Sequence, residues 1–299
     1  MGEPCEVLVI GAGPAGLTAA TYLARFRRRL TVVDDAHSRA RYIPVSRNCP
    51  GFAHGVNGEE LLDELREQAA RHGVQVRITT VRAMRREGDL FVAEFDDGRL
   101  QAQRVVLATG LVDVLPELPG VEDAVKRGVV RLCAVCDAFE TADRRVAVMG
   151  SAQALASHAR FLCAFSHAPL AVVAPAAAMP AAQRDELRAI GVEPIEDVCG
   201  IRLEHDAIRL ERAGGETLQA DVLYPVLGAR PRSQLAKALG ASCDEDGYVW
   251  TDSHQRTAVP GLYAIGDVTH ALNQIAVGVG QAAIAASAIH NDLPLRPLR

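Results

Sequence analysis

The feature that most constrains the fold of this chain is a glycine turn directly after a short apolar run. Glu6-Val-Leu-Val-Ile10 has the length and composition of a buried parallel strand, and Gly11-Ala-Gly13-Pro-Ala-Gly16 follows at once. Residues 15–26 are then predicted to form a helix, and residues 30–33 a second strand that ends at Asp34. This order predicts a dinucleotide-binding βαβ unit.

Each small residue of the turn has a physical role in such a unit. Gly11 permits the tight turn, Gly13 lets a phosphate approach the backbone, and Gly16 lets the helix pack closely on the strand. The helix N-terminus offers free N–H groups and its dipole to a pyrophosphate. Asp34 lies 18 residues after Gly16, where an acid binds the ribose. Strand, helix, second strand and terminal acid therefore stand in register.

The remaining patterns predict a second α/β unit that interrupts the first. The first unit continues with a helix and four strands, predicted over residues 58–72, 74–78, 82–86, 90–95 and 104–110, with a turn at Asp97-Gly98. Pro116, Pro119 and Gly120 mark a boundary, and residues 145–149 form the first strand of the second unit. After Gly228 the chain returns to the first unit, with a strand over residues 259–265 and a helix over residues 275–291.

We therefore predict an α/β fold of two Rossmann-like, three-layer dinucleotide-binding domains, the second inserted into the first. Residues 1–115 and 231–299 would form the first domain. Residues 116–230 would form the inserted one.

The second unit keeps the shape of a nucleotide domain but has lost much of its phosphate chemistry. In Gly150-Ser-Ala152-Gln-Ala-Leu155, alanine replaces the second glycine and leucine occupies the third small position. Pro175-Ala-Ala-Ala178 follows a strand predicted over residues 170–174 and offers no acid or arginine. Arg184 and Arg188 come later, on a predicted helix, where we expect a solvated face rather than a phosphate clamp.

The inserted unit also carries a vicinal thiol pair, Cys133-Ala-Val-Cys136-Asp137. Two cysteines at this spacing can form a small, reducible disulfide, in which one thiolate faces the substrate and the other resolves the mixed disulfide. Asp137 can act as general acid or base for thiol protons, or as the N-cap of a helix over residues 137–140. A helix that begins there would lower the pKa of the Cys136 thiol.

The amino-acid composition limits the class of protein and the cellular compartment that fit this chain. The seven cysteines are odd in number and otherwise scattered, so we predict neither a zinc site nor a disulfide scaffold, and no metal. This usage fits a reduced cytoplasmic protein with one functional pair. A net charge of −5 indicates no nucleic-acid surface. No apolar run is long enough to span a membrane, and the first residues lack the pattern of a secretory signal.

Six short motifs together resemble those of low-molecular-weight thioredoxin reductases, in the same order and over nearly the whole chain. They are Gly11-Ala-Gly-Pro-Ala-Gly16, Asn48-Cys-Pro-Gly51, Ala108-Thr-Gly110, Cys133-Ala-Val-Cys-Asp137, Gly266-Asp267 and Gln274-Ile-Ala276. The resemblance implies FAD as cofactor, a thioredoxin-like protein or a small dithiol or disulfide as partner, and a homodimer.

The same resemblance implies roles for individual residues. Cys136 would be the flavin-side sulfur and Cys133 the substrate-side one, with Asp137 as their acid or base. The cofactor-binding residues that it implies are Gly11, Gly13, Pro14, Ala15, Gly16, Asp34, Asn48, Val81, Thr109, Gly110, Gly266, Asp267, Gln274, Ile275 and Ala276.

The second unit departs from the family's glycine motif and lacks its basic clamp for the NADPH 2′-phosphate. With these departures, the sequence also resembles thioredoxin-reductase-like proteins that do not use NADPH. One such group oxidises the dithiols of natural products with oxygen, and another draws electrons from ferredoxin. A non-catalytic flavin-binding redox sensor is a further alternative, but such a protein has no use for the complete set of Cys133, Cys136 and Asp137. We therefore predict an FAD-dependent disulfide oxidoreductase for which NADPH is a poor reductant.

Overall fold

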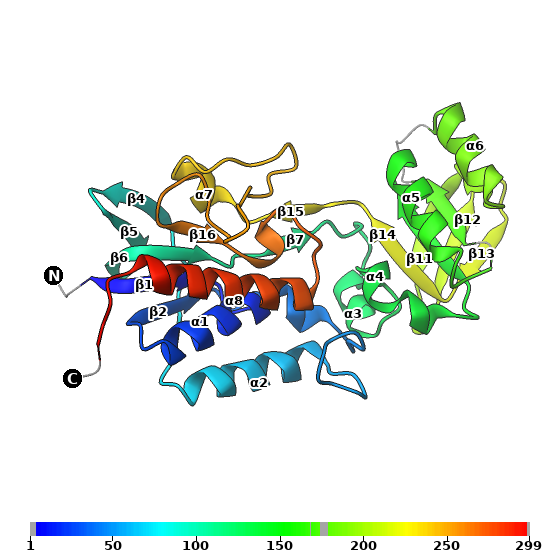
Figure 1. Ribbon diagram of the computed structural model, residues 1–299. Coiled ribbons are helices and arrows are strands. Elements are labelled where there is room, and N and C mark those ends of the chain that lie inside the picture. Colours follow the sequence, from blue (N-terminus) through cyan, green and yellow to red (C-terminus); the bar gives the residue numbers. More distant parts are fainter. Residues whose placement is uncertain (1–3, 168, 174–178, 298–299) are drawn as a thin grey trace.

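The chain folds into two α/β domains joined by a narrow connector (Figure 1). The computed structural model describes residues 4–167, 169–173 and 179–297. A seven-stranded sheet forms the first domain and a four-stranded parallel sheet the second. The connector pairs β7 (Leu111–Asp113) antiparallel with β15 (Ala229–Pro231). The expected pair of Rossmann-like domains, one inserted into the other, is confirmed. We propose residues 1–115, 116–230 and 231–299 as their segments, with both boundaries beside this connector.

The first sheet has the order β3-β2-β1-β6-β5-β4, and β16 also pairs with β6. Its strands are β1 (Cys5–Ile10), β2 (Leu30–Asp34), β3 (Val76–Ile78), β4 (Ala83–Glu87), β5 (Leu90–Phe95), β6 (Gly98–Leu107) and β16 (Leu262–Ala264). β1 pairs in parallel with both β2 and β6, so their carboxyl ends meet at one edge. In open α/β sheets this edge is where ligands bind.

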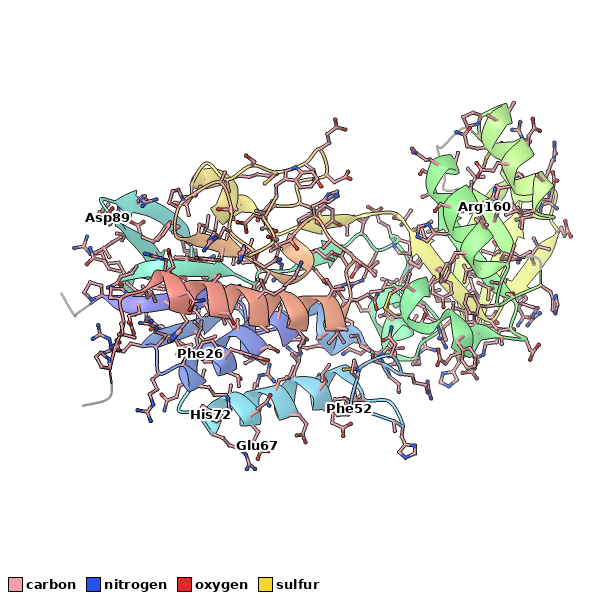
Figure 2. All side chains as sticks on the ribbon, in the orientation of Figure 1. Phe26, Phe52, Glu67, His72, Asp89 and Arg160 are labelled. Carbon is pink, nitrogen blue, oxygen red and sulfur yellow. A yellow bond between two sulfur atoms is a disulfide. The ribbon has the colours of Figure 1, made fainter. Side chains whose placement is uncertain are left out.

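Three helices cover one face of this sheet: α1 (Pro14–Arg25), α2 (Gly58–Ala70) and α8 (Ile275–Asp292) (Figure 1). α1 packs against both of the others. Small buried residues such as Ala282 and Ala285 let α8 approach it closely. On the outer side of α2, Glu67 points into solvent and pairs with Arg71 (Figure 2). On the other face, α7 (Gln234–Ala238) packs near the meander of β4, β5 and β6.

The inserted domain also has three layers. Its sheet, β10-β9-β8-β14, comprises β10 (Pro194–Ile195), β9 (Leu170–Val173), β8 (Val146–Gly150) and β14 (Val222–Val226). α5 (Ala152–Leu162) and α6 (Ala181–Ala189) cover one face. The other face carries α3 (Val121–Lys126) and an antiparallel sheet of β11 (Val198–Leu203), β12 (Ile208–Arg212) and β13 (Thr217–Ala220).

The sequence predicted most elements but misplaced some boundaries. The turn expected at Asp97-Gly98 lies one residue earlier, because Gly98 already pairs with Phe95 at the start of β6. β16 covers only part of the strand predicted over residues 259–265. There the amide of Leu262 donates to the carbonyl of Val259, and the positive φ of Gly261 (+83°) completes a turn that delays the strand.

Candidate active site

A cavity of about 390 Å³ lies between the two domains, at the carboxyl ends of β1 and β2. Most residues predicted to bind the cofactor line it: Gly11, Gly13, Pro14, Ala15, Asp34, Asn48, Val81, Thr109, Gly110, Gly266, Asp267, Gln274 and Ile275. Cys133, Cys136 and Asp137 line it from the inserted domain. Gly16 and Ala276 are not among the lining residues. The fold thus brings the glycine turn and the thiol pair, far apart in sequence, to one cavity.

The glycines of the turn have two different roles: Gly11 and Gly16 allow close backbone packing, and Gly13 leaves space for a ligand. A Cβ on Gly11 would lie 2.2 Å from the carbonyl oxygen of Ala108, and one on Gly16 would lie 1.9 Å from that of Gly11. A Cβ on Gly13 would meet only the Ser38 hydroxyl, at 3.3 Å. Gly13 is the N-cap of α1 and, within the described residues, no side chain caps this helix. Its first N–H groups therefore face the cavity, ready for an anion.

Asp34 holds this turn from the end of β2. Its carboxylate accepts hydrogen bonds from the amides of Ala12 (2.8 Å) and Ala36 (3.0 Å), and the residue is only 6% exposed. The ribose acid predicted from the sequence therefore also fixes the backbone of the glycine turn. It still lines the cavity.

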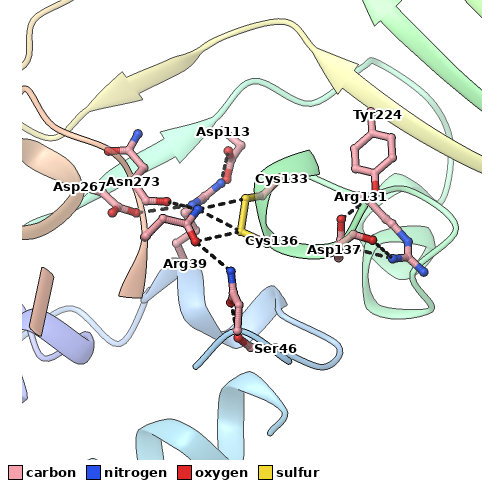
Figure 3. The surroundings of a disulfide bond; sticks show 12 residues. Arg39, Ser46, Asp113, Arg131, Cys133, Cys136, Asp137, Tyr224, Asp267 and Asn273 are labelled. Atoms are coloured by element: carbon pink, nitrogen blue, oxygen red, sulfur yellow. Dashed lines mark hydrogen bonds and ion pairs between the residues drawn. A yellow bond between two sulfur atoms is a disulfide. The ribbon is translucent and has the colours of Figure 1, made fainter. Parts of the chain in front are cut away.

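Cys133 and Cys136 form a disulfide, with Cα atoms 5.3 Å apart. The first domain contacts this bond through Gln274, whose Nε2 donates to the Sγ of Cys133 (3.4 Å) and of Cys136 (3.3 Å). Figure 3 shows the disulfide between Asn273 of the first domain and Asp137 of the inserted one. Asn48 Nδ2 in turn donates to Gln274 Oε1 (3.1 Å). Two residues predicted to lie near the cofactor thus hold the sulfurs against the cavity.

The helix that carries the pair begins earlier than predicted. α4 (Ala134–Asp137) starts directly after Cys133, its N-cap, because the amide of Cys136 bonds to the carbonyl of Cys133 (3.0 Å). The expectation that Cys136 precedes a helix is therefore wrong. Asp137 comes before the 3₁₀ turn η2 (Ala138–Thr141), but its side chain does not cap that turn. Asp137 thus stands at the N-cap position of η2, but without the side-chain hydrogen bond of a cap.

The Asp137 carboxylate instead faces the inserted domain. The Tyr224 hydroxyl donates a hydrogen bond to Asp137 Oδ1 (2.7 Å), and Arg131 Nη1 lies 3.4 Å from Oδ2 (Figure 3). Burial raises the pKa of Asp137, and the hydrogen bond from Tyr224 and the charge of Arg131 only partly counter this. A carboxyl with a raised pKa keeps its protonated form to a higher pH than usual, which suits proton exchange with thiols.

An arginine that the sequence analysis missed lines the cavity and joins Asp267, which also lines it, to Asp113, which does not. Arg39, in the 3₁₀ turn η1 (Arg39–Tyr42), donates to both oxygens of Asp113 (2.6 and 2.9 Å) and to Asp267 (3.4 Å). Burial raises the pKa of Asp267; Arg39 counters part of this, while nearby Asp113 adds to it. Arg39 therefore limits the negative charge of this wall, which includes the 3₁₀ turn η3 (Gly266–Val268).

The structure describes neither a cluster of metal ligands nor a membrane-spanning helix in the parts of the chain that it covers. No three His, Cys, Asp or Glu side chains of these parts lie close enough together to share a metal ion. Within the same ranges, no helix combines the length and apolarity needed to cross a lipid bilayer.

Comparison with known proteins agrees with this geometry. The sequence profile of the pyridine nucleotide-disulphide oxidoreductases matches residues 5–285. A thioredoxin reductase of Mycolicibacterium smegmatis is 29% identical, and the alignment covers 94% of this chain and 94% of the relative. A crystal structure of HlmI is 30% identical with a TM-score of 0.88, and it covers 96% of this chain and 92% of its own. A thioredoxin reductase structure from Streptococcus pyogenes MGAS5005 is 27% identical with a TM-score of 0.84, over 96% and 97% of the two chains.

A glycine-turn nucleotide site that shares its cavity with a cysteine pair defines a flavin-type disulfide oxidoreductase. The chain belongs to the pyridine nucleotide-disulphide oxidoreductase family. Within it, the protein is an FAD-dependent disulfide oxidoreductase of the thioredoxin-reductase type.

Proposed function

We propose that this protein passes electrons between bound FAD and a dithiol or disulfide substrate through the Cys133–Cys136 pair. The observation that carries the proposal is the position of the disulfide. It lies on the wall of the cavity that the glycine turn also lines, and Gln274 donates to both sulfurs. When bound, the flavin supplies two-electron redox chemistry next to this pair.

The cavity has features that suit FAD. Gly13 leaves the N-terminus of α1 open to a pyrophosphate, and Asp34 lies at the end of β2 for a ribose. Among the described residues, the side-chain oxygen of Asn273 is buried without a hydrogen-bond partner, and Asn273 lines the same cavity. A buried acceptor left unpaired is costly, so a ligand donor is expected to meet it.

Arg39 gives a direct test of this site. In Arg39→Met, we expect FAD to bind the apoprotein tenfold or more weakly, a loss of about 1.4 kcal/mol or more, because Asp267 then faces a dianionic pyrophosphate without its cation, with Asp113 left unpaired close behind it. FAD fluorescence titration measures this. Arg41→Met is the matched control, because Arg41 is exposed, pairs with Glu59 and lies outside the cavity. Equal FAD affinity in the two variants would remove Arg39 from the site.

We further propose the division of labour within the pair that the family resemblance implies. Cys133 exchanges with the substrate, Cys136 faces the flavin, and Asp137 moves thiol protons. A thioredoxin-like protein or a small dithiol is the proposed partner, since the similar chains include thioredoxin reductases. A homodimer remains a prediction of the same resemblance, and a reducing cytoplasmic setting remains a prediction from the cysteine usage.

The second nucleotide site supports the proposal that NADPH is a poor reductant. Leu155 is fully buried in the core between α5 and its sheet, where a dinucleotide motif needs a small residue. Arg184 is bound to Glu196, and Arg188 to Glu193, each through two hydrogen bonds. These ion pairs support the prediction of a solvated face rather than a phosphate clamp. The stretch of residues 175–178 lies outside the described residues.

Anaerobic mixing of the FAD-bound protein separates the possible reductants. We expect dithiothreitol to bleach the flavin absorbance quickly and micromolar NADPH to do so at least about a hundredfold more slowly, because a lost arginine–phosphate contact alone costs that much affinity. Fast stoichiometric bleaching by NADPH would return the protein to the ordinary thioredoxin reductases. If NADPH fails, two further mixings separate the remaining partners. Bleaching of the oxidised protein by reduced ferredoxin would identify ferredoxin as the electron donor. Rapid return of the flavin absorbance when oxygen is added to the dithiothreitol-reduced protein would identify a dithiol oxidase.

A further inference from the structure

The surroundings of Asp137 point to two residues outside the sequence motifs. Figure 3 shows Tyr224 and Arg131 on the side of the disulfide away from Asn273, both directed at Asp137. We propose that Tyr224 and Arg131 are positioning residues that hold Asp137 as proton donor and acceptor for the Cys133–Cys136 disulfide. This inference rests on the redox role proposed above for that pair.

The backbone fixes both partners relative to α4. The amide of Leu223 donates to the carbonyl of Val129 (2.9 Å), and the amide of Arg131 donates to the carbonyl of Leu223 (2.9 Å). The segment before α4 is therefore registered against β14, the strand that carries Tyr224. Arg131 also donates through Nη1 to the carbonyl of Asp137 (3.1 Å). The geometry around the carboxylate is thus set by main-chain contacts rather than by flexible side chains alone.

The hydroxyl of Tyr224 has a role that packing does not explain. Tyr224 is 1% exposed and belongs to the apolar core that includes Ala134, inside the motif, and Ala138, directly after it. A phenylalanine would fill this core equally well, whereas a buried phenol must find a hydrogen-bond partner. Here the partner is Asp137. Burial, and then the nearby carboxylate, raise the pKa of Tyr224, so that it stays protonated and remains a donor.

The charges that face Asp137 come from several elements. Burial raises its pKa, the Tyr224 hydroxyl from β14 and Arg131 from the preceding segment lower it, and Glu140 in η2 raises it. Tyr224 and Arg131 therefore stabilise the carboxylate form against burial. Opposing effects of this kind allow a carboxyl to release and regain a proton within the working pH range.

The chemistry needs such a group. When a substrate dithiol attacks the disulfide, a mixed disulfide forms, the Cys133–Cys136 bond breaks, and Cys136 leaves as a thiolate. The second substrate thiol then closes the substrate disulfide and releases Cys133. The substrate is oxidised, the pair is reduced by two electrons, and two protons pass from the substrate thiols to the two cysteines. Asp137, next to Cys136 in the chain, accepts a proton from a substrate thiol and returns it to a leaving sulfur.

The test is the pH dependence of anaerobic flavin reduction by dithiothreitol in the FAD-bound protein. Asp137→Asn identifies the limb of the profile that Asp137 controls, because that limb is lost. In Tyr224→Phe, we expect the limb to move to higher pH by roughly one to two units, since a hydrogen bond to a charged group has been removed. Tyr263→Phe is the matched control: it removes another buried hydroxyl, from β16 outside the cavity, and leaves the limb in place.

Variants of Arg131 test the same inference independently, and they do so even if Tyr224→Phe does not fold. Arg131→Met is expected to move the limb to higher pH, and Arg131→Lys to restore most of the wild-type position because it keeps the charge. A limb unchanged in Tyr224→Phe and Arg131→Met, with only a lower melting temperature, would overturn the inference. Full activity of Cys133→Ser in the same assay would instead overturn the redox role of the pair.

Discussion

Replacing either Cys133 or Cys136 by serine is expected to reduce disulfide turnover to the background rate. A hydroxyl cannot take the place of a thiolate in exchange with a disulfide, and each sulfur is needed once in every cycle. The variants should differ in their spectra. Cys133→Ser leaves the flavin-side thiolate free and should show a long-wavelength absorbance band with bound FAD, whereas Cys136→Ser should lack it. The measurements are steady-state dithiol oxidation and a visible absorbance spectrum.

Cys199→Ser is the control for this pair, since Cys199 is an exposed free cysteine of the inserted domain, outside the cavity. It should keep wild-type activity and spectrum. Should a serine variant of the pair retain full turnover, the redox centre lies elsewhere. A band that appears in Cys136→Ser and not in Cys133→Ser would reverse the roles assigned to the two sulfurs.

The same added methyl group should reduce folding stability at one glycine of the first turn and FAD affinity at another. In Gly16→Ala, the new Cβ would lie 1.9 Å from the backbone oxygen of Gly11, so strand and helix must separate. We expect a loss of folding stability of about 3 kcal/mol or more, because overpacking between fixed backbones cannot relax. Gly13→Ala should leave the melting temperature of the apoprotein nearly unchanged. Its FAD affinity should fall on the order of a hundredfold, since the methyl lies where the phosphate approaches.

Thermal unfolding of the apoproteins and FAD titration separate the two effects. Gly280→Ala is the control: Gly280 lies within α8 with open space around its Cβ position, so alanine should be neutral or stabilising by up to about 1 kcal/mol. A stable Gly16→Ala, or a Gly13→Ala that binds FAD normally, would contradict this division between packing and access.

Local sequence patterns predicted the parts of this fold that depend on neighbours in the chain. The run of β1, glycine turn, α1 and β2 was predictable because each element has its own period or turn residue. The insertion was predictable because the buried-strand pattern returns after Gly228. The start of α4 was not, since a four-residue helix has too few positions for a periodic signal.

The missed site residues have a different cause. Tyr224 reaches Asp137 across 87 residues of sequence, and Arg39 reaches Asp113 across 74. Nothing near these residues in the chain distinguishes them from a core tyrosine or a surface arginine. Their partners are set by how β14 and the connector are placed in three dimensions, which no local pattern encodes.

The disulfide is carried by one domain and hydrogen-bonded by the other. Gln274 contacts both sulfurs from the cavity side. A protein partner would need access to one of these sulfurs, together with a large contact area of its own. Under the proposed function, a macromolecular substrate and the flavin would therefore engage the pair in turn. Turnover with such a substrate would follow a double-displacement scheme, in which the cysteines store two electrons between one half-reaction and the next.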